Sequence, residues 1–346
     1  MPSTTDVALS RLLAEGRARA AATDPEHAEL WEALADASEG GKRFRPALVT
    51  ATHDALGGNL SAAVVQVGAA VELLHTAFVI HDDVIDRDDL RRGRLNVSGT
   101  FRARARAAGA TPDGADDYAR TAGILAGDLA LAAAIRTVAT CGASTPVVGR
   151  LLDLFDGALH TTAAGELADV RLSLGVDIAS VPQSLAMAAD KTSAYSFSLP
   201  LQAGAVLAGA DESLVDRLGQ AGRALGIAFQ LIDDLIGVFG DPLRTGKSAT
   251  SDLRACKQTP LLAHARSTLE WTHISAYLGR DLTEDELTKA RSLLTTSGSR
   301  QFVEDLSDAH LCAANAVVEE LGIPLDCLAG LTTRAPVFAD SVEVAA

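Results

Sequence analysis

The segment His81-Asp82-Asp83-Val84-Ile85-Asp86 decides how this chain folds and what it binds. It ends a proline-free stretch, residues 61–86, in which alanine, valine and leucine recur at helical spacing. Asp82 and Asp86 are four residues apart, so they project from one face of a helix, about 6 Å apart along its axis. These carboxylates repel each other and oppose the negative end of the helix dipole, which costs stability unless a cation is present. Oxygen ligands of this kind suit Mg²⁺.

The alternative interpretation is a solvated acidic helix end, balanced by the arginines at positions 87, 91 and 92. Apolar residues lead directly into the cluster, however, which favours the mouth of a cavity over an open surface.

A second acidic pair, Asp233-Asp234, lies within the apolar run Phe229–Ile236. One such pair is weak support for a metal site. Two pairs on separate apolar helices are each costly unless both face a shared, metal-filled cavity. The sequence therefore predicts one site that holds an anionic ligand through metal.

Cations gather at the glycine turn Gly40-Gly41-Lys42-Arg43-Phe44-Arg45-Pro46, just before an expected helix. Backbone amides at a helix start, together with cationic side chains, suit a phosphate group. Arg91 and Arg92 add to this supply. We therefore expect a second anionic group, held directly by lysine and arginine.

Composition supports helices. Of the 346 residues, 48% are hydrophobic but only 4% are aromatic, so alanine, leucine, valine and isoleucine must build the core. The net charge of −15 argues against nucleic acid or anionic lipid as a general partner. The four cysteines form no CxxC pair, and no signal peptide or membrane span is expected. A cytoplasmic protein is the expectation.

Helical patterning runs through nearly the whole chain, and strand signals are scarce. Helices are expected at about 6–22, 26–38, 46–56, 61–86, 97–107, 116–140, 145–173, 182–198, 211–239, 257–272, 283–296 and 301–320. The loops at 109–117 and 240–257 do not resemble domain linkers. We expect one domain over residues 1–346, with a peripheral tail after about 335.

Several motifs together match a known family in order and spacing. They are Gly-Lys-Arg-Phe-Arg-Pro at 41–46, Glu72-Leu-Leu-His75, Asp82-Asp83-x-x-Asp86 with Arg91-Arg92-Gly93, Gly127-Asp128, Lys191-Thr192, Phe229-Gln230 before Asp233-Asp234, Gly246-Lys247 and Lys257. The chain resembles the trans-isoprenyl diphosphate synthases, the polyprenyl synthetase family. The run at 234–242 looks most like the geranylgeranyl diphosphate synthases of actinobacteria.

The resemblance implies an all-α bundle around one deep central cavity, a homodimer, and a prenyltransferase that joins isopentenyl diphosphate to an allylic diphosphate of five to fifteen carbons. It implies three Mg²⁺ ions per site, with Asp82, Asp86 and Asp233 as ligands. The implied catalytic residues are Asp82, Asp83, Asp86, Lys191, Gln230, Asp233 and Asp234. Those implied for the allylic diphosphate are Arg91, Lys191, Lys247 and Lys257, and those for isopentenyl diphosphate are Lys42, Arg45, His75 and Arg92. Thr192 and Gln230 would lie beside the reacting carbons.

Some positions depart from the family pattern. Gly237 stands where the second motif usually carries its third aspartate, and Asp241 is a possible replacement. Glu166 stands where many relatives carry glutamine. The charges at 169–171 are expected to be a solvated helix face.

Product length is expected to depend on the residues one turn before the first motif. By the family's rules these form the floor of the cavity, here Ala77 and Phe78. A small and a large residue together resemble a C20 stop, so geranylgeranyl diphosphate is the expected product. Farnesyl or longer-chain diphosphates are alternatives.

Two other functions stay open. Asp233, Gly237 and Asp241 have the spacing of a class I terpene cyclase metal site. A cyclase needs no second diphosphate site, however, and lines its pocket with aromatic side chains. A non-catalytic subunit of a heteromeric synthase would commonly lack aspartates from the first motif, which this chain keeps.

Overall fold

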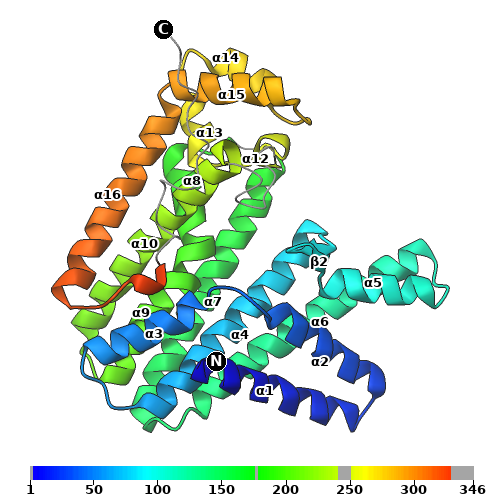
Figure 1. Cartoon of the computed structure of the whole chain (residues 1–346), viewed down its shortest axis with the longest axis vertical. Helices are drawn as coiled ribbons and strands as arrows, with labels where there is room; N and C mark the ends of the chain where they lie inside the picture. Colours follow the sequence, from blue (N-terminus) through cyan, green and yellow to red (C-terminus); the bar gives the residue numbers. More distant parts are fainter. Residues whose placement is uncertain (1–2, 176–177, 241–250, 329–346) are drawn as a thin grey trace. The chain divides into compact units, whose positions relative to one another are not determined.

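The computed structural model describes residues 3–175, 178–240 and 251–328, and these are mostly helical (Figure 1). Contacts divide the chain into two compact units. The first unit contains Met1–Phe155 and Pro200–Val215, and the second contains Asp156–Leu199 and Asp216–Ala346. The predicted all-α class is confirmed. A single domain over residues 1–346 stays a prediction, and the tail expected after about 335 lies outside the described residues.

The first unit is built on the pair of helices α4 and α6. Its elements are α1 (Thr4–Ala21), α2 (Pro25–Ser38), α3 (Phe44–Ala55), α4 (Ser61–Asp86), β1 (Leu90–Arg91), β2 (Arg94–Leu95), α5 (Val97–Ala107) and α6 (Pro112–Ala139), with the start of α7 (Thr145–Ser173) and most of α9 (Leu199–Ala208). Helix α4 packs against α6, α3 and α1, and α6 also packs against α5.

Small residues bring α4 and α6 close together. Ala126, Ala130 and Ala134 repeat every fourth residue along one face of α6, and all three are fully buried. A side chain at Gly127 would collide with the ring of His81 on α4, where a Cβ would lie 2.1 Å from Nε2. The last turns of α4, which carry the first acidic motif, are thereby held against α6.

Arg43 pins the turn before α3 to three other segments. Its Nε donates to Asp6 Oδ1 at 3.0 Å, Nη1 to Glu72 Oε1 at 2.9 Å, and Nη2 to the Ser38 carbonyl at 2.7 Å. The Glu72 side chain is only 5% exposed, so this is a largely buried ion pair whose rupture would leave a carboxylate uncompensated. Arg43 therefore serves to stabilise the fold.

The second unit surrounds the long helix α10. Its elements are the rest of α7, α8 (Val181–Ala188), the π-helix η1 (Ala189–Ser198), α10 (Glu212–Phe239) from Asp216 on, α12 (Ser251–Arg254), α13 (Pro260–Ala265), α14 (Trp271–Ile274), η2 (Ser275–Tyr277), α15 (Glu284–Thr296), α16 (Ser299–Glu320) and η3 (Asp326–Leu328).

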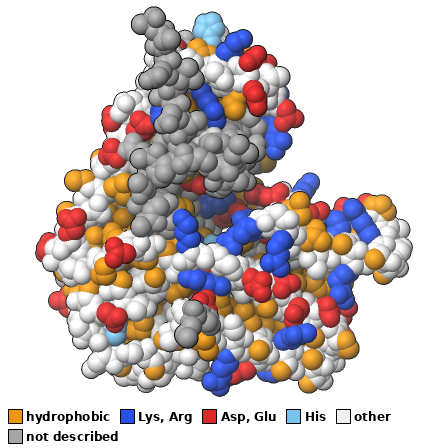
Figure 2. Space-filling view, in the orientation of Figure 1, with side chains coloured by type: hydrophobic (Ala, Val, Ile, Leu, Met, Phe, Trp, Pro, Cys, Tyr) orange, Lys and Arg blue, Asp and Glu red, His pale blue; other side chains and the backbone are white. Residues whose placement is uncertain are grey.

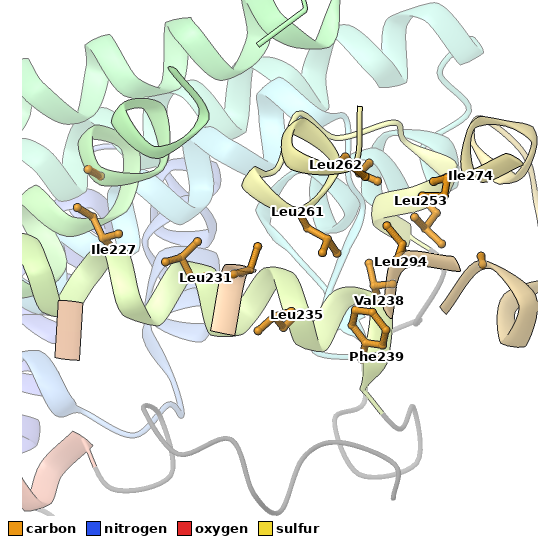
Figure 3. Close-up of a cluster of buried hydrophobic side chains, with 14 residues drawn as sticks. Ile227, Leu231, Leu235, Val238, Phe239, Leu253, Leu261, Leu262, Ile274 and Leu294 are labelled. Atoms are coloured by element: carbon orange, nitrogen blue, oxygen red, sulfur yellow. The ribbon is translucent and has the colours of Figure 1, made fainter. Parts of the chain in front are cut away.

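Its core is apolar and centred on α10 (Figure 3). Leu231, Leu235 and Val238 follow one another at helical spacing and are buried. They pack with residues from the segments after α10, such as Leu253 and Leu261. The core thus fixes both the helix that carries Asp233 and the segment that leads to Lys257.

Most expected helices are confirmed, with bounds within a few residues. One exception is 109–117, where α6 already begins at Pro112 because Thr111 accepts a hydrogen bond from the Gly114 amide and caps it. Another is 199–208, where α9 follows η1 directly and carries Pro200 as its second residue.

Two more expectations were wrong in detail. The helix expected at 257–272 is broken, because the Ser267 and Thr268 hydroxyls donate to carbonyls at the end of α13. A short hairpin, β1–β2, was not predicted. Its turn places Arg92 and Gly93 at positive φ, 53° and 74°, a geometry that asparagine-glycine usually signals.

By length and composition alone, α4 and α6 could each cross a membrane. A core helix meets the same criterion, and 72% of the most apolar window of α4 is buried, against 44% for α6. Figure 2 shows both basic and acidic side chains on the visible face. The absence of a membrane span stays a prediction.

We predict that Gly204→Ala destabilises the protein by about 1–3 kcal/mol. A Cβ on Gly204 of α9 would lie 2.5 Å from the Val49 carbonyl oxygen and 2.8 Å from Thr52 Cβ, both on α3. Urea unfolding measures the change. The matched control is Gly149→Ala on α7, whose Cβ would meet nothing within 4 Å. It should raise stability by up to about 1 kcal/mol through helix propensity. Equal effects of the two substitutions would contradict the packing argument.

Candidate active site

The first acidic motif presents two of its three aspartates to solvent. Asp82 is partly buried, Asp86 is exposed, and Asp83 is buried at 3% exposure. Adjacent residues on a helix point about 100° apart, so the pair Asp82-Asp83 necessarily splits between an open and a buried direction. Asp82 and Asp86 are therefore the accessible carboxylates of this helix end.

Arg91 on β1 bridges the aspartate pair. Its Nε donates to Asp83 Oδ1 at 2.7 Å, and its Nη2 donates to Asp82 Oδ2 at 3.1 Å. Burial raises the pKa of Asp83, while the Arg91 guanidinium acts in the opposite direction. Asp83 thus holds Arg91 beside Asp82, and the β1–β2 hairpin supplies the backbone that makes this contact.

Residues predicted to hold isopentenyl diphosphate come together within the first unit. Arg92 donates from Nη1 to the Glu39 carbonyl at 3.2 Å and packs on Gly40, where a Cβ would lie 3.2 Å from that nitrogen. Lys42, two residues after Gly40, is exposed. Arg45 stacks over the Phe44 ring, 4.5 Å from its centroid.

His75 lies among these cations. Burial lowers its pKa well below the usual value, and the charges of Arg45, Arg92, Arg91 and Arg43 lower it further. The imidazole is therefore neutral at pH 7 and lies near several guanidinium groups. Such a group can donate a hydrogen bond from its ring N–H to an anion without adding a charge of its own.

The second acidic motif repeats the division seen in the first. Asp233 is partly buried, whereas Asp234 is 7% exposed. Burial raises the pKa of Asp234 to about 8, and the charges of Asp233 and Asp252 also raise it, while a hydrogen bond from Gln230 lowers it. Asp233 is the accessible carboxylate of this motif.

A hydrogen-bonded chain orients the Gln230 amide. Gln230 Nε2 donates to Asp234 Oδ1 at 2.8 Å, and Thr192 Oγ1 donates to Gln230 Oε1 at 3.3 Å. These bonds link η1 with α10 inside the second unit. The predicted pair Thr192 and Gln230 is thus brought together.

Lys191, in the π-helix η1, contacts two carboxylates of α7. Its Nζ lies 2.7 Å from Asp169 Oδ2 and 3.0 Å from Glu166 Oε2. Asp169, expected on a solvated face with residues 170 and 171, is partly exposed and also pairs with Lys191. π-Helical turns often occur at functional sites.

Asp252 occupies the space that a side chain at Gly237 would fill. A Cβ on Gly237 would lie 2.2 Å from Asp252 Oδ2. The Asp252 side chain is 11% exposed and pairs through Oδ1 with Lys257 Nζ at 3.1 Å. The third carboxylate near the second motif therefore comes from Asp252. Asp241, the replacement considered from sequence, and Lys247 lie outside the described residues.

The donor set suits a metal that arrives with its ligand. Among the described residues, no group of three His, Cys, Asp or Glu side chains is placed to hold a metal ion. Mg²⁺ does not require one, because it commonly keeps several waters and binds one or two carboxylates together with substrate phosphates. The accessible pair Asp82 and Asp86, and Asp233 on α10, fit that mode of binding.

The residues expected to set product length lie on α4, about one turn before the first acidic motif. Ala77 is fully buried and Phe78 is partly buried. Their effect on product length stays a prediction.

Sequence reasoning gave no role to Asp252, expected Asp169 on a solvated face and counted Arg43 among the cations suited to a phosphate. In the structure each of the three pairs with a side chain of opposite charge in a neighbouring functional segment. One signal was present in the sequence: a glycine in place of an acid at 237 leaves room for a carboxylate from elsewhere. The others depend on tertiary contacts.

A sequence profile described as polyprenyl synthetase matches residues 27–294. The chain belongs to the polyprenyl synthetase family. The predicted resemblance and the assignment as a prenyltransferase are thereby confirmed at the level of this family.

Individual members support the assignment. The chain is 34% identical over 286 residues to the geranylfarnesyl diphosphate synthase of Aeropyrum pernix, covering 82% of this chain and 84% of that protein. It is 33% identical over 293 residues to the (2E,6E)-farnesyl diphosphate synthase of Mycobacterium tuberculosis, covering 82% and 75%. The crystal structure of the Corynebacterium glutamicum geranylgeranyl pyrophosphate synthase, complexed with isoprenyl diphosphate and magnesium, matches at 30% identity, a TM-score of 0.82 and 95% coverage of both chains.

These similar proteins are named for three different products. Similarity across the family therefore leaves the product length of this member undecided.

We predict that His75→Gln flattens the pH dependence of this family member's stability. The folded state keeps His75 neutral, whereas the unfolded chain protonates it near pH 6.5. The wild type therefore loses stability as the pH falls through 6.5. Between pH 7.5 and 5.5, its unfolding free energy should fall by about 1 kcal/mol more than that of the variant. Urea unfolding at both pH values measures this, and parallel losses would contradict a neutral His75.

We predict that Gly237→Asp, which restores the usual family residue, destabilises the metal-free protein by about 1–3 kcal/mol. The new side chain would collide with the Asp252 carboxylate and repel it. The double variant Gly237→Asp with Asp252→Ala should regain much of the loss, because the new carboxylate takes the vacated space. Chemical unfolding of the four proteins gives the coupling energy. Additive losses would show that the two positions do not compete for one space.

Proposed function

We propose that this protein condenses isopentenyl diphosphate with an allylic diphosphate of five to fifteen carbons, and that its main product is geranylgeranyl diphosphate. The observation that carries the proposal is the basic neighbourhood of Arg45, His75 and Arg92 in the first unit, with the exposed Lys42 in the same glycine turn as Arg45. Two chemically distinct groups of residues suit two diphosphates. A terpene cyclase handles a single diphosphate and would have no use for the second group.

In this proposal the basic neighbourhood binds isopentenyl diphosphate. Guanidinium groups donate paired hydrogen bonds to phosphate oxygens. The neutral His75 adds a directional hydrogen bond in the same place. Holding the double bond of this substrate in line with the allylic carbon would supply much of the acceleration.

The acidic motifs would bind the allylic diphosphate through metal. Asp82, Asp86 and Asp233 would hold Mg²⁺, and the family resemblance suggests three ions. When bound, the metal neutralises the diphosphate leaving group as the allylic carbon–oxygen bond breaks. The crystallised Corynebacterium glutamicum protein contained magnesium, which supports this choice of ion.

Cationic side chains would stabilise the same leaving group directly. Arg91 and Lys191 are each held beside carboxylates, and Lys257 beside Asp252. They bind oxygens on which negative charge grows as the bond breaks, so they stabilise the transition state more than the bound substrate. Lys247 belongs to this group by resemblance.

The reacting carbons form an allylic cation, which the double bond of isopentenyl diphosphate attacks. The Gln230 and Thr192 oxygens, oriented by their hydrogen bonds, would face the positive charge. Loss of a proton, with the released diphosphate as the base, completes the new double bond. No dedicated histidine or glutamate base is required.

Further parts of the proposal rest on the family resemblance. The protein is proposed to act as a homodimer in the cytoplasm. The first motif retains all three aspartates, which argues against a non-catalytic subunit. Ala77 and Phe78 are proposed to stop growth at C20.

The test is product analysis. The purified protein is incubated with Mg²⁺, labelled isopentenyl diphosphate and C5, C10 or C15 primers in turn, and the dephosphorylated alcohols are sized. A dominant C20 alcohol is expected. C15 or C30 products would retain prenyl transfer but refute the role of Ala77 and Phe78. Hydrocarbon formed from a C15 or C20 diphosphate alone, with no incorporation, would establish a cyclase instead.

The acidic motif is tested in the same assay. Asp82→Asn should lower kcat at least about 100-fold, since it removes metal-mediated stabilisation worth about 3 kcal/mol. The control is Asp153→Asn, an exposed carboxylate on α7 outside the motifs, which should retain wild-type kcat. Similar rates for the two variants would rule out the proposed role of Asp82.

A further inference from the structure

Lys191 is surrounded by more negative charge than a diphosphate-binding lysine needs. Its Nζ contacts Glu166 and Asp169 at 3.0 and 2.7 Å, so one ammonium lies between two carboxylates. The three side chains are 26%, 20% and 37% exposed for Lys191, Glu166 and Asp169, so solvent screens their interactions only in part.

Backbone packing sets this geometry. A Cβ on Gly165 would lie 2.2 Å from the Lys191 backbone nitrogen, so α7 and η1 touch at this glycine. Glu166 is the next residue of α7, and Asp169 lies one turn further along. Both carboxylates are thereby brought within reach of Nζ by main-chain contact.

The two carboxylates have different consequences for an anionic ligand. One carboxylate balances the ammonium and fixes its position. The second adds negative charge where a diphosphate would approach. A neutral amide at position 166 could keep the hydrogen bond to Nζ without that charge.

We propose that Glu166 is a positioning residue that acts through Lys191 to weaken the hold on allylic diphosphates and thereby limits product length. This inference rests on the proposed function. After each condensation, the lengthened allylic diphosphate either leaves or accepts another isopentenyl unit. Weaker binding of the diphosphate speeds departure, so the carboxylate at 166 favours shorter products than an amide would.

The test compares Glu166→Gln with the wild type. The variant should bind inorganic diphosphate in the presence of Mg²⁺ about 5–20-fold more tightly by calorimetry. Its KM for the C10 and C15 primers should fall by a similar factor, while the single-turnover rate at saturation changes less than about twofold. With limiting primer, its products should shift toward longer chains.

Two controls separate charge from structure. Glu166→Asp keeps the charge and should stay close to wild type in diphosphate affinity. Glu304→Gln removes a carboxylate from another partly buried pair, with Arg300 on α16, where Nε lies 3.0 Å from Oε1, and should change neither affinity nor product length. Unchanged or weaker diphosphate binding by Glu166→Gln, with unchanged product lengths, would overturn the inference. Absence of prenyl transfer by the wild type would instead refute the proposed function.

Discussion

Repulsion between neighbouring carboxylates is the constraint on which this structure depends. Each acidic motif places adjacent aspartates on an apolar helix, and the fold separates them in the same way. Asp83 and Asp234 turn into the protein, while Asp82 and Asp233 stay accessible. Arg91 compensates the first pair, and Gln230 and Lys257 lie near the second. Asp82, Asp86 and Asp233 are the carboxylates that we propose as metal ligands, and the separation within each pair leaves Asp82 and Asp233 in accessible positions.

Much of this could be predicted from the sequence, because the determinants are local. Helical spacing of alanine and leucine identified α4, α6, α7 and α10, and four-residue spacing placed Asp82 and Asp86 on one face. Elements whose form depends on distant contacts were not predicted. The hairpin at 90–95 relies on an arginine-glycine turn, and η1 takes its π form where glycines of α7 and α10 let the backbones meet.

The residues of the candidate site fall into the same two groups, those identified by local sequence and those that depend on distant contacts. Residues in contiguous motifs, such as His75 and Gln230, were identified by pattern, and the structure brings each beside predicted partners. The contacts of Asp252 with Lys257 and of Glu166 with Lys191 required tertiary knowledge, because each joins segments that only the fold brings together. Pattern identifies the groups that would touch a ligand, whereas folding decides which charges surround them.

Arg43 illustrates how neighbours in a motif can serve opposite purposes. Its guanidinium is bound by Asp6, Ser38 and Glu72, so it ties the first helix of the chain to the turn that carries Lys42. Trimming the amino terminus would therefore do more than remove a peripheral helix. It would also remove Asp6, one of the groups that hold Arg43 and the turn that carries Lys42. A shortened protein could then bind a substrate more weakly while keeping every residue that contacts it.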